Sequence, residues 1–212
     1  MELDDEGSGW LVRQLAQSDL GEIGGLEELR DLSFDELRLV GSDFADRVIE
    51  DCSFANCVLT DAKFNAAIIR RCQFEGAAVQ GTGFFGATIE ECKMIGLDFR
   101  RGTRLGAATF SKTNLDYALL RGVDLTNAEF TDCSMRECDL YGADLSNASL
   151  VNCDLTDADW TGVRTHDTDL RGSSLRGLDL RNGPYGIVLT TGQVVALAGD
   201  IGAKVIDPAE ER

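Results

Sequence analysis

The sequence predicts an all-β protein, a four-sided β-helix with a short helical cap at each end. Three observations predict it. Large apolar residues recur at every fifth position, at 29 of 30 such positions with one slip in the spacing. Small residues mostly precede them by two positions, and glycine, asparagine or aspartate mostly follows them by two. Similar residues also recur every twentieth position, which corresponds to four sides per coil.

The five-residue period runs over Phe34–Phe99, slips by one residue at 100–102, and continues over Leu105–Leu180. We call the large apolar residue of each unit its centre. Thr165 is the one polar centre and Trp160 the largest, so we expect the core to widen locally there. Neither the 3.6-residue period of a helix nor the two-residue period of a strand produces this pattern.

Each five-residue unit is predicted to form a short extended side and a corner. Residues two apart in extended backbone point to the same side, so the centre and the small residue before it face inward. Glycine, asparagine and aspartate suit the turn that follows. Ile49, Ile69 and Ile89 are twenty apart and should stack on successive coils, as in a solenoid. Thirty units give about 7.5 coils and a rod on the order of 36 Å long.

Three segments are expected along the chain. Residues 1–31 form an acidic N-terminal segment, partly helical or flexible, residues 32–182 form the β-helix, and residues 183–212 form a C-terminal cap and dimerisation segment. Short helices are predicted around Trp10–Leu15 and over Thr191–Ala198. Caps are expected because the open end of a β-helix exposes unpaired backbone groups.

Composition and charge predict a soluble, cytoplasmic protein. The 212 residues carry 37 acids and 20 bases, a net charge of -17, which argues against direct binding of nucleic acid. No apolar run approaches the ~18 residues of a membrane span. The acidic first residues are unlike a signal peptide. We therefore expect no membrane association.

Several chemical motifs are better explained by the fold. The seven cysteines all stand at the small inward position, where free cysteine acts as a small apolar residue. They are Cys52, Cys57, Cys72, Cys92, Cys133, Cys138 and Cys153. Gly81–Gly86 matches a dinucleotide-binding fingerprint, but its first and last glycines are corners and Phe84 is a centre. His166, the single histidine, follows a centre and should face solvent. We predict no metal, no cofactor and no catalysis.

The five-residue units resemble those of the pentapeptide-repeat family, whose consensus is Ala-Asp/Asn-Leu-x-x. Residues 143–147, Ala-Asp-Leu-Ser-Asn, match this consensus, and residues 123–127 and 153–157 match it closely. The resemblance covers about residues 32–182. It implies that the β-helix is right-handed and quadrilateral.

The resemblance also implies a function. The best-understood members of the family resemble B-form DNA in size and charge and bind DNA gyrase or topoisomerase IV, which affects quinolone sensitivity. The slip at 100–102 matches their near-central break, and the C-terminal segment resembles the one that joins two of their rods tail to tail. No repeat-interrupting loop exceeds one residue, which favours the loopless mycobacterial-type members over the plasmid-borne ones. A homodimer is therefore expected, with contacts at Val194, Val195, Leu197, Ile201, Val205 and Ile206.

The negative charge is unevenly distributed. Residues 1–37 have a net charge of -9, residues 38–102 of -1, residues 103–180 of -6 and the remainder of -1. Asp139, Asp159 and Asp179 are twenty apart and should form one outward column, with Asp124 and Asp144 on the adjoining side. We predict that these five aspartates form the partner-binding acidic face and stand in for DNA phosphates.

Two alternatives remain open. An aspartate before a centre can instead serve the fold by accepting hydrogen bonds from nearby backbone. The protein would then be a β-helical scaffold that binds another protein without DNA mimicry. Separately, a cluster of five arginines is either a solvated face or a contact for an acidic partner surface. It consists of Arg70, Arg71, Arg100, Arg101 and Arg104.

Overall fold

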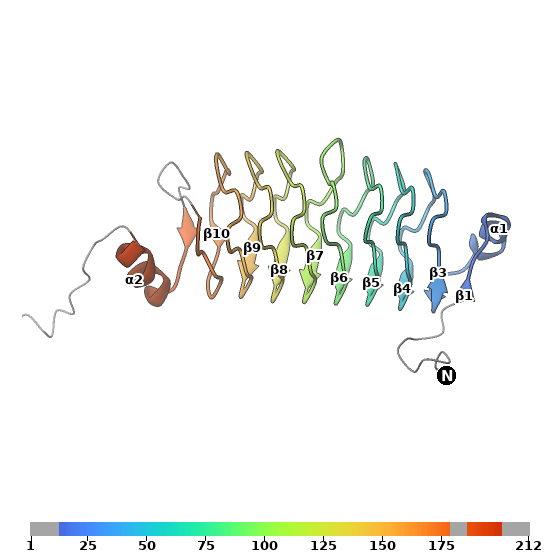
Figure 1. Cartoon of the computed structure of the whole chain (residues 1–212), viewed down its shortest axis with the longest axis horizontal. Helices are drawn as coiled ribbons and strands as arrows, with labels where there is room; N and C mark the ends of the chain where they lie inside the picture. Colours follow the sequence, from blue (N-terminus) through green and yellow to red (C-terminus); the bar gives the residue numbers. More distant parts are fainter. Residues whose placement is uncertain (1–12, 179–185, 201–212) are drawn as a thin grey trace, which may run out of the picture.

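The computed structural model describes residues 13–178 and 186–200 and shows a parallel β-helix with a helical segment at each end (Figure 1). One side carries a nine-stranded parallel sheet in the order β2-β4-β5-β6-β7-β8-β9-β10-β11. These strands are β2 Glu28–Arg30, β4 Val48–Glu50, β5 Ile68–Arg70, β6 Thr88–Glu90, β7 Thr109–Ser111, β8 Glu129–Thr131, β9 Ser149–Val151, β10 Thr168–Asp169 and β11 Ile187–Val188. The predicted all-β, four-sided β-helix is confirmed.

The register of the sheet confirms the period of twenty and its single slip. Ile49 pairs with Ile69, and Ile69 pairs with Ile89. Between β6 and β7 the step is one residue longer, because Ile89 pairs with Phe110. The additional residue lies in the segment 100–104, between two centres, and leaves the register on either side intact.

Single bridges in the same register hold the other three sides. We number the sides in chain order, with the sheet on the first. Ser33 and Ser53 are bridge partners on the second side, and the third and fourth sides follow in each coil. The corners use left-handed backbone, with φ of 58° at Asp157 and 65° at Gly142. The turn residues that the sequence repeats every five positions therefore occur where the chain bends.

The core is a stack of centres. Every described centre from Phe34 to Leu175 is buried, apart from the half-buried Thr165. Aromatic rings stack from coil to coil, with centroids 4.7 Å apart for Phe34 and Phe54. Burial of each such side chain contributes about 1.5–3 kcal/mol, so the stacked centres are the main stabilising element of the rod.

The cysteines lie inside the rod, as predicted. All seven are free and buried. The Cys57 thiol donates to the Phe34 carbonyl at 2.8 Å, and the Cys138 thiol donates to the Leu115 carbonyl at 3.0 Å. Burial raises the pKa of both thiols to about 12. These cysteines therefore act as small core residues that also satisfy backbone carbonyls.

The N-terminal end begins with an extended segment. The elements are β1 Arg13–Gln14, the 3-10 helix η1 Gln17–Asp19, α1 Leu20–Ile23 and β3 Leu32–Ser33. β1 pairs with β3. The helix predicted around Trp10–Leu15 is wrong at residues 13–15, and residues 10–12 lie outside the described part. The open edge of the first coil is the reason, because it accepts the N–H groups of Arg13 and Leu15 at 2.8 and 2.9 Å.

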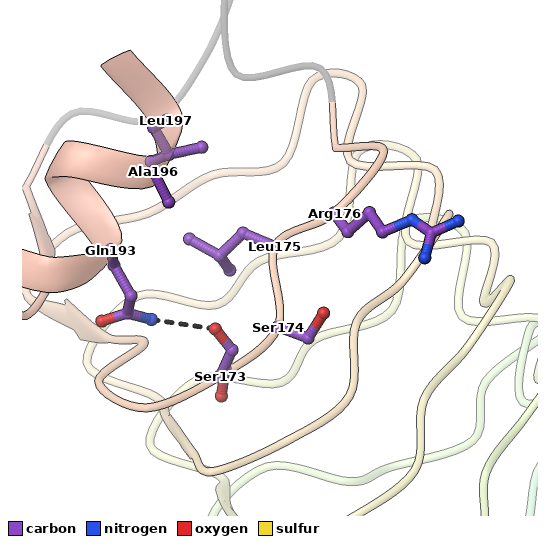
Figure 2. Close-up of a pocket in the computed structure, with 7 residues that line it drawn as sticks. All are labelled: Ser173, Ser174, Leu175, Arg176, Gln193, Ala196 and Leu197. Carbon is purple, nitrogen blue, oxygen red and sulfur yellow. Dashed lines mark hydrogen bonds between the residues drawn. The ribbon is translucent and has the colours of Figure 1, made fainter. Parts of the chain in front are cut away.

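The C-terminal helix α2 (Thr191–Asp200) lies over the last coil, as predicted for Thr191–Ala198. Thr190 and Gln193 form a capping box: the Gln193 Oε1 accepts the Thr190 N–H at 2.8 Å, and the Thr190 hydroxyl accepts the Gln193 N–H at 3.3 Å. The Gln193 amide also donates to the Ser173 carbonyl at 2.9 Å, and Leu175 lies in the hollow between coil and helix (Figure 2). Gln193 thus both starts the helix and anchors it to the rod.

Candidate protein-interaction surface

Four of the five predicted aspartates lie in the described part of the chain. Asp139 and Asp159 are bridge partners on the third side, and Asp124 and Asp144 are bridge partners on the fourth. The expected two columns on adjoining sides are therefore present for these four. Asp179 lies outside the described residues.

Each of the four carboxylates serves the turn that follows it. One carboxylate oxygen accepts the backbone N–H of the residue two positions ahead. The donors are Thr126 for Asp124, Tyr141 for Asp139, Ser146 for Asp144 and Thr161 for Asp159, at 3.0, 3.2, 3.0 and 3.0 Å. The aspartates therefore stabilise the turns, which is the structural role given above as the alternative to partner binding. It occupies one oxygen of each carboxylate and leaves the negative charge in place.

One arginine pairs with an aspartate on each of the two sides. On the fourth side Arg164 lies 3.0 Å from the Asp144 carboxylate. On the third side Arg121 lies 2.9 Å from the Asp139 carboxylate. Among the residues that the structure describes, no arginine or lysine nitrogen lies within 4.0 Å of Asp124 or Asp159. Each side therefore retains one aspartate whose charge no arginine or lysine neutralises by contact.

Two further acids extend the third-side column. Glu137 and Asp157 are exposed at the corner between the second and third sides, two residues before Asp139 and Asp159. We call these four residues the acidic edge. Equivalent positions on neighbouring coils are about 4.8 Å apart. The acidic edge thus carries four carboxylates on two coils, and Arg121 pairs with one of them, Asp139.

Sequence reasoning missed Glu137 and Asp157. It followed only the position before each centre, whereas these two stand at the corner after a centre. Their spacing of twenty was the available signal.

Two exposed tyrosines flank the acidic edge. Tyr117 is 54% exposed and Tyr141 is 45% exposed. The negative charge of Glu137, and a hydrogen bond to it, raise the pKa of Tyr117. The guanidinium of Arg121 lies over the Tyr141 ring, 4.4 Å from its centroid. Tyrosine is enriched in protein interfaces, so this surface combines charge with aromatic contact area.

In the first half of the rod, opposite charges pair along the sheet. Glu50 contacts Arg30 and lies 2.9 Å from Arg70, which in turn lies 3.1 Å from Glu90. Side chains of alternating sign thus stack along the first side of four successive coils. The pairing agrees with the low net charge of residues 38–102 and leaves the second half as the acidic part of the rod.

The residues predicted for dimerisation divide into three groups. Val194 and Val195 are exposed on α2, at 51% and 45%. Leu197 is partly buried against the core and lines the hollow over Leu175. Ile201, Val205 and Ile206 lie outside the described residues. Of the residues predicted for dimerisation, Val194 and Val195 are therefore the ones that the structure describes as exposed.

The structure also shows where the residues lie that the sequence analysis did not assign to a chemical site. The His166 side chain is 76% exposed, as predicted. Gly81 and Gly86 are corners with φ of 73° and 66°, and Phe84 is a buried centre. In the described ranges, no three histidine, cysteine or acidic side chains are grouped so that they could bind a metal ion. No helix of those ranges has the length and apolar character needed to cross a bilayer.

Comparison with known families agrees with this geometry. A family model described as a pentapeptide repeat region matches residues 84–160, and one described as pentapeptide repeats in eight copies matches residues 148–182. The chain is a pentapeptide-repeat protein. The same five-residue units continue on the N-terminal side of the matched region, where the buried centres begin at Phe34. No curated protein sequence matches the chain.

Solved structures share the pentapeptide-repeat fold. QnrB1, a plasmid-mediated fluoroquinolone resistance protein, is 25% identical over 82% of this chain and 90% of its own, with a TM-score of 0.63. HetL, a pentapeptide-repeat protein involved in heterocyst differentiation regulation in the cyanobacterium Nostoc, is 19% identical over 85% of this chain and 98% of its own, with a TM-score of 0.55. At that identity the likeness to HetL shows the fold alone.

Proposed function

We propose that this protein is a non-enzymatic, cytoplasmic DNA mimic that binds a type II topoisomerase, such as DNA gyrase, and modulates its activity or its sensitivity to inhibitors. The acidic edge is the observation that carries the proposal. Its four carboxylates form two adjacent columns on a stiff rod, and Arg121 pairs with one of them, Asp139. A basic groove that binds DNA phosphates attracts such an array over long range.

The likeness to QnrB1 supports this choice of partner. QnrB1 acts in fluoroquinolone resistance, and this chain covers 90% of it at a TM-score of 0.63. The family members that the sequence resembles affect quinolone sensitivity by binding DNA gyrase or topoisomerase IV, so the same class of partner is proposed for this acidic rod. A homodimer that joins two rods through Val194 and Val195 lengthens the acidic surface.

A supercoiling assay with purified DNA gyrase tests the proposal. The variant Glu137→Gln/Asp139→Asn/Asp157→Asn/Asp159→Asn removes the charge of the acidic edge. The amides keep an oxygen that accepts the backbone N–H, so the turns persist. Asp124→Asn/Asp144→Asn is the control, because it makes the same kind of change at two aspartates of the fourth side, where Arg164 pairs with Asp144.

We expect the wild-type protein to inhibit supercoiling at micromolar concentration, and less so as salt rises. We expect the acidic-edge variant to lose at least about tenfold in potency and the control less than about threefold. Full potency of the acidic-edge variant would exclude the acidic edge as the surface that binds the topoisomerase. No inhibition by any form at micromolar protein would exclude the topoisomerase.

A β-helical scaffold without DNA mimicry is the second candidate. The observation that favours it is the hydrogen bond that each of the four described aspartates accepts from the backbone N–H two residues ahead. In that case the carboxylates stabilise turns, and a partner binds the flat sides. Binding of that partner would be insensitive to the acidic-edge variant and to salt.

A further inference from the structure

We infer that the break in the five-residue period forms a second docking site, at which a protein partner binds through a segment that carries carboxylates next to an apolar side chain. The site comprises Phe85, Arg101 and Arg104 and the hollow beside them, which we call the frame-break hollow. It lies on the fourth side and has the opposite sign to the acidic edge. The inference does not depend on the proposed function.

The additional residue makes the chain project at this point. The buried Thr103 donates its hydroxyl to the Val79 carbonyl at 2.9 Å and holds the inner part of the segment. The outer part carries Arg101 and Gly102 in left-handed backbone, with φ of 64° and 88°. The loop between β6 and β7 reaches further from the rod than its neighbours (Figure 1). Arg101 therefore lies on the projecting loop, and Arg104 lies beside it.

Pairing within the fold accounts for three of the five clustered arginines. Arg70 pairs with Glu50 and Glu90, Arg71 lies 2.7 Å from Asp51, and Arg100 lies 2.8 Å from Asp98. Within the described ranges, no carboxylate oxygen lies within 4.0 Å of Arg101 or Arg104. These two arginines therefore retain positive charge that the rod does not neutralise by contact.

Phe85 is the one exposed phenylalanine. The other nine are buried, and Phe85 is 59% exposed. Its ring leans over Gly106, where an added Cβ would lie 3.9 Å from a ring carbon. The fold does not require an aromatic residue at this outward position, since other units carry Ala45, Thr126 or Ser146 there. An exposed aromatic ring beside a hollow is typical of an anchor point in a protein interface.

A hollow of about 330 Å³ joins these features. It is lined by Phe85, Thr103, Arg104, Gly106, Ala107, Asp124, Thr126 and Asn127. Asp124 is the one acid in its wall, and one of its carboxylate oxygens accepts both the N–H and the hydroxyl of Thr126, at 3.0 and 2.7 Å. The volume suits one or two side chains of a partner rather than a helix.

These features select a protein segment as the occupant. The ring of Phe85 and the small residues Gly106 and Ala107 provide an apolar surface for an aliphatic or aromatic side chain. Arg101 and Arg104 attract flanking carboxylates, and an arginine fork binds a carboxylate in two hydrogen bonds. A nucleic acid is disfavoured because the whole chain carries a net charge of -17.

Binding of synthetic peptides, followed by NMR of the ¹⁵N-labelled full chain, tests the inference. The probe is a capped pentapeptide that alternates aspartate with leucine, and the control peptide replaces each aspartate by lysine. We expect the acidic peptide to shift the amides of residues 85, 101–107 and 124–127, with a Kd below about 1 mM. The lysine peptide should leave them unchanged.

Variants then assign the contacts. Phe85→Ala should weaken binding at least about fivefold, and Arg101→Glu/Arg104→Glu should abolish it. Lys93→Glu, a charge reversal on the second side, should have no effect. The inference is overturned if neither peptide shifts the hollow, if both do so equally, or if the variants bind as the wild type does. Preferential binding of a short single-stranded DNA in the hollow would also overturn it.

Discussion

Asp139 and Asp159 are bridge partners on neighbouring coils, and Arg121 lies 2.9 Å from the first of them. Asp159 therefore keeps a free charge, whereas that of Asp139 is partly neutralised. We predict that Asp159→Asn weakens the binding of a basic partner more than Asp139→Asn does. Arg121→Gln should strengthen binding and cost at most about 1 kcal/mol of stability. Titration of DNA gyrase with each variant measures the three affinities. Equal affinities for the variants would contradict the prediction.

Glu50 is predicted to stabilise the first side of the rod. Its side chain is 8% exposed and contacts Arg30 and Arg70, which are 48% and 37% exposed. Because these arginines can regain water, Glu50→Ala should cost about 1–2 kcal/mol of unfolding free energy, less than a fully buried pair. Urea denaturation measures this cost. A loss of unfolding free energy smaller than that caused by the control substitution Glu91→Ala would contradict the prediction.

Glu91 provides the matched control for Glu50. It is 44% exposed and lies 3.5 Å from Lys112, which is 60% exposed. Glu91→Ala should therefore cost less than about 0.5 kcal/mol.

The buried thiols predict a loss of stability at alkaline pH. Burial raises the pKa of Cys57 and Cys138 to about 12 from 9.0. Above pH 9 the unfolded chain releases these protons while the folded chain retains them, so stability falls as the pH rises towards 12. Each thiol contributes a slope of at most about 1.4 kcal/mol per pH unit.

Denaturation experiments between pH 9 and 12 check this linkage. The quantity to compare is the slope of the unfolding free energy against pH, not the unfolding free energy itself. Cys57→Ala/Cys138→Ala should have a shallower dependence than the wild type, even though the substitutions cost some stability. An unchanged slope would show that these thiols titrate alike in both states.

In the native protein at pH 8 we expect no thiol to react with a disulfide reagent, and in denaturant all seven.

The two exposed valines of α2 predict a dimer that depends on them. Val194→Asp/Val195→Asp should convert a species of twice the chain mass of 23.0 kDa into a monomer, as measured by sedimentation. The helix should remain in place, because Gln193 and Leu197 anchor it to the last coil. A wild-type monomer at micromolar concentration would contradict the prediction.

The sequence predicts the β-helix well because its determinants are local. Each unit carries its own inward residues and its own turn, so the buried centres and the slip between Phe99 and Leu105 follow from spacing alone. The N-terminal strand β1 could not be predicted in the same way. Its extended form depends on pairing with β3, nearly twenty residues away, and not on local preference.

The candidate surfaces were only partly predictable for the same reason. The aspartate columns follow from the period of twenty, but their neutralisation depends on arginines of other units, such as Arg121 beside Asp139. The exposure of Phe85 follows from its outward position. The frame-break hollow beside it depends on how the additional residue displaces the chain, which spacing does not reveal.

The most direct test of DNA mimicry is the affinity of purified DNA gyrase for this protein as a function of salt, measured for the wild type and for the acidic-edge variant Glu137→Gln/Asp139→Asn/Asp157→Asn/Asp159→Asn. We predict that wild-type affinity falls steeply as salt rises, and that the variant binds at least about tenfold more weakly at low salt with a flatter dependence. Equal affinities and equal salt dependence for the two proteins would contradict the proposed role of the acidic edge.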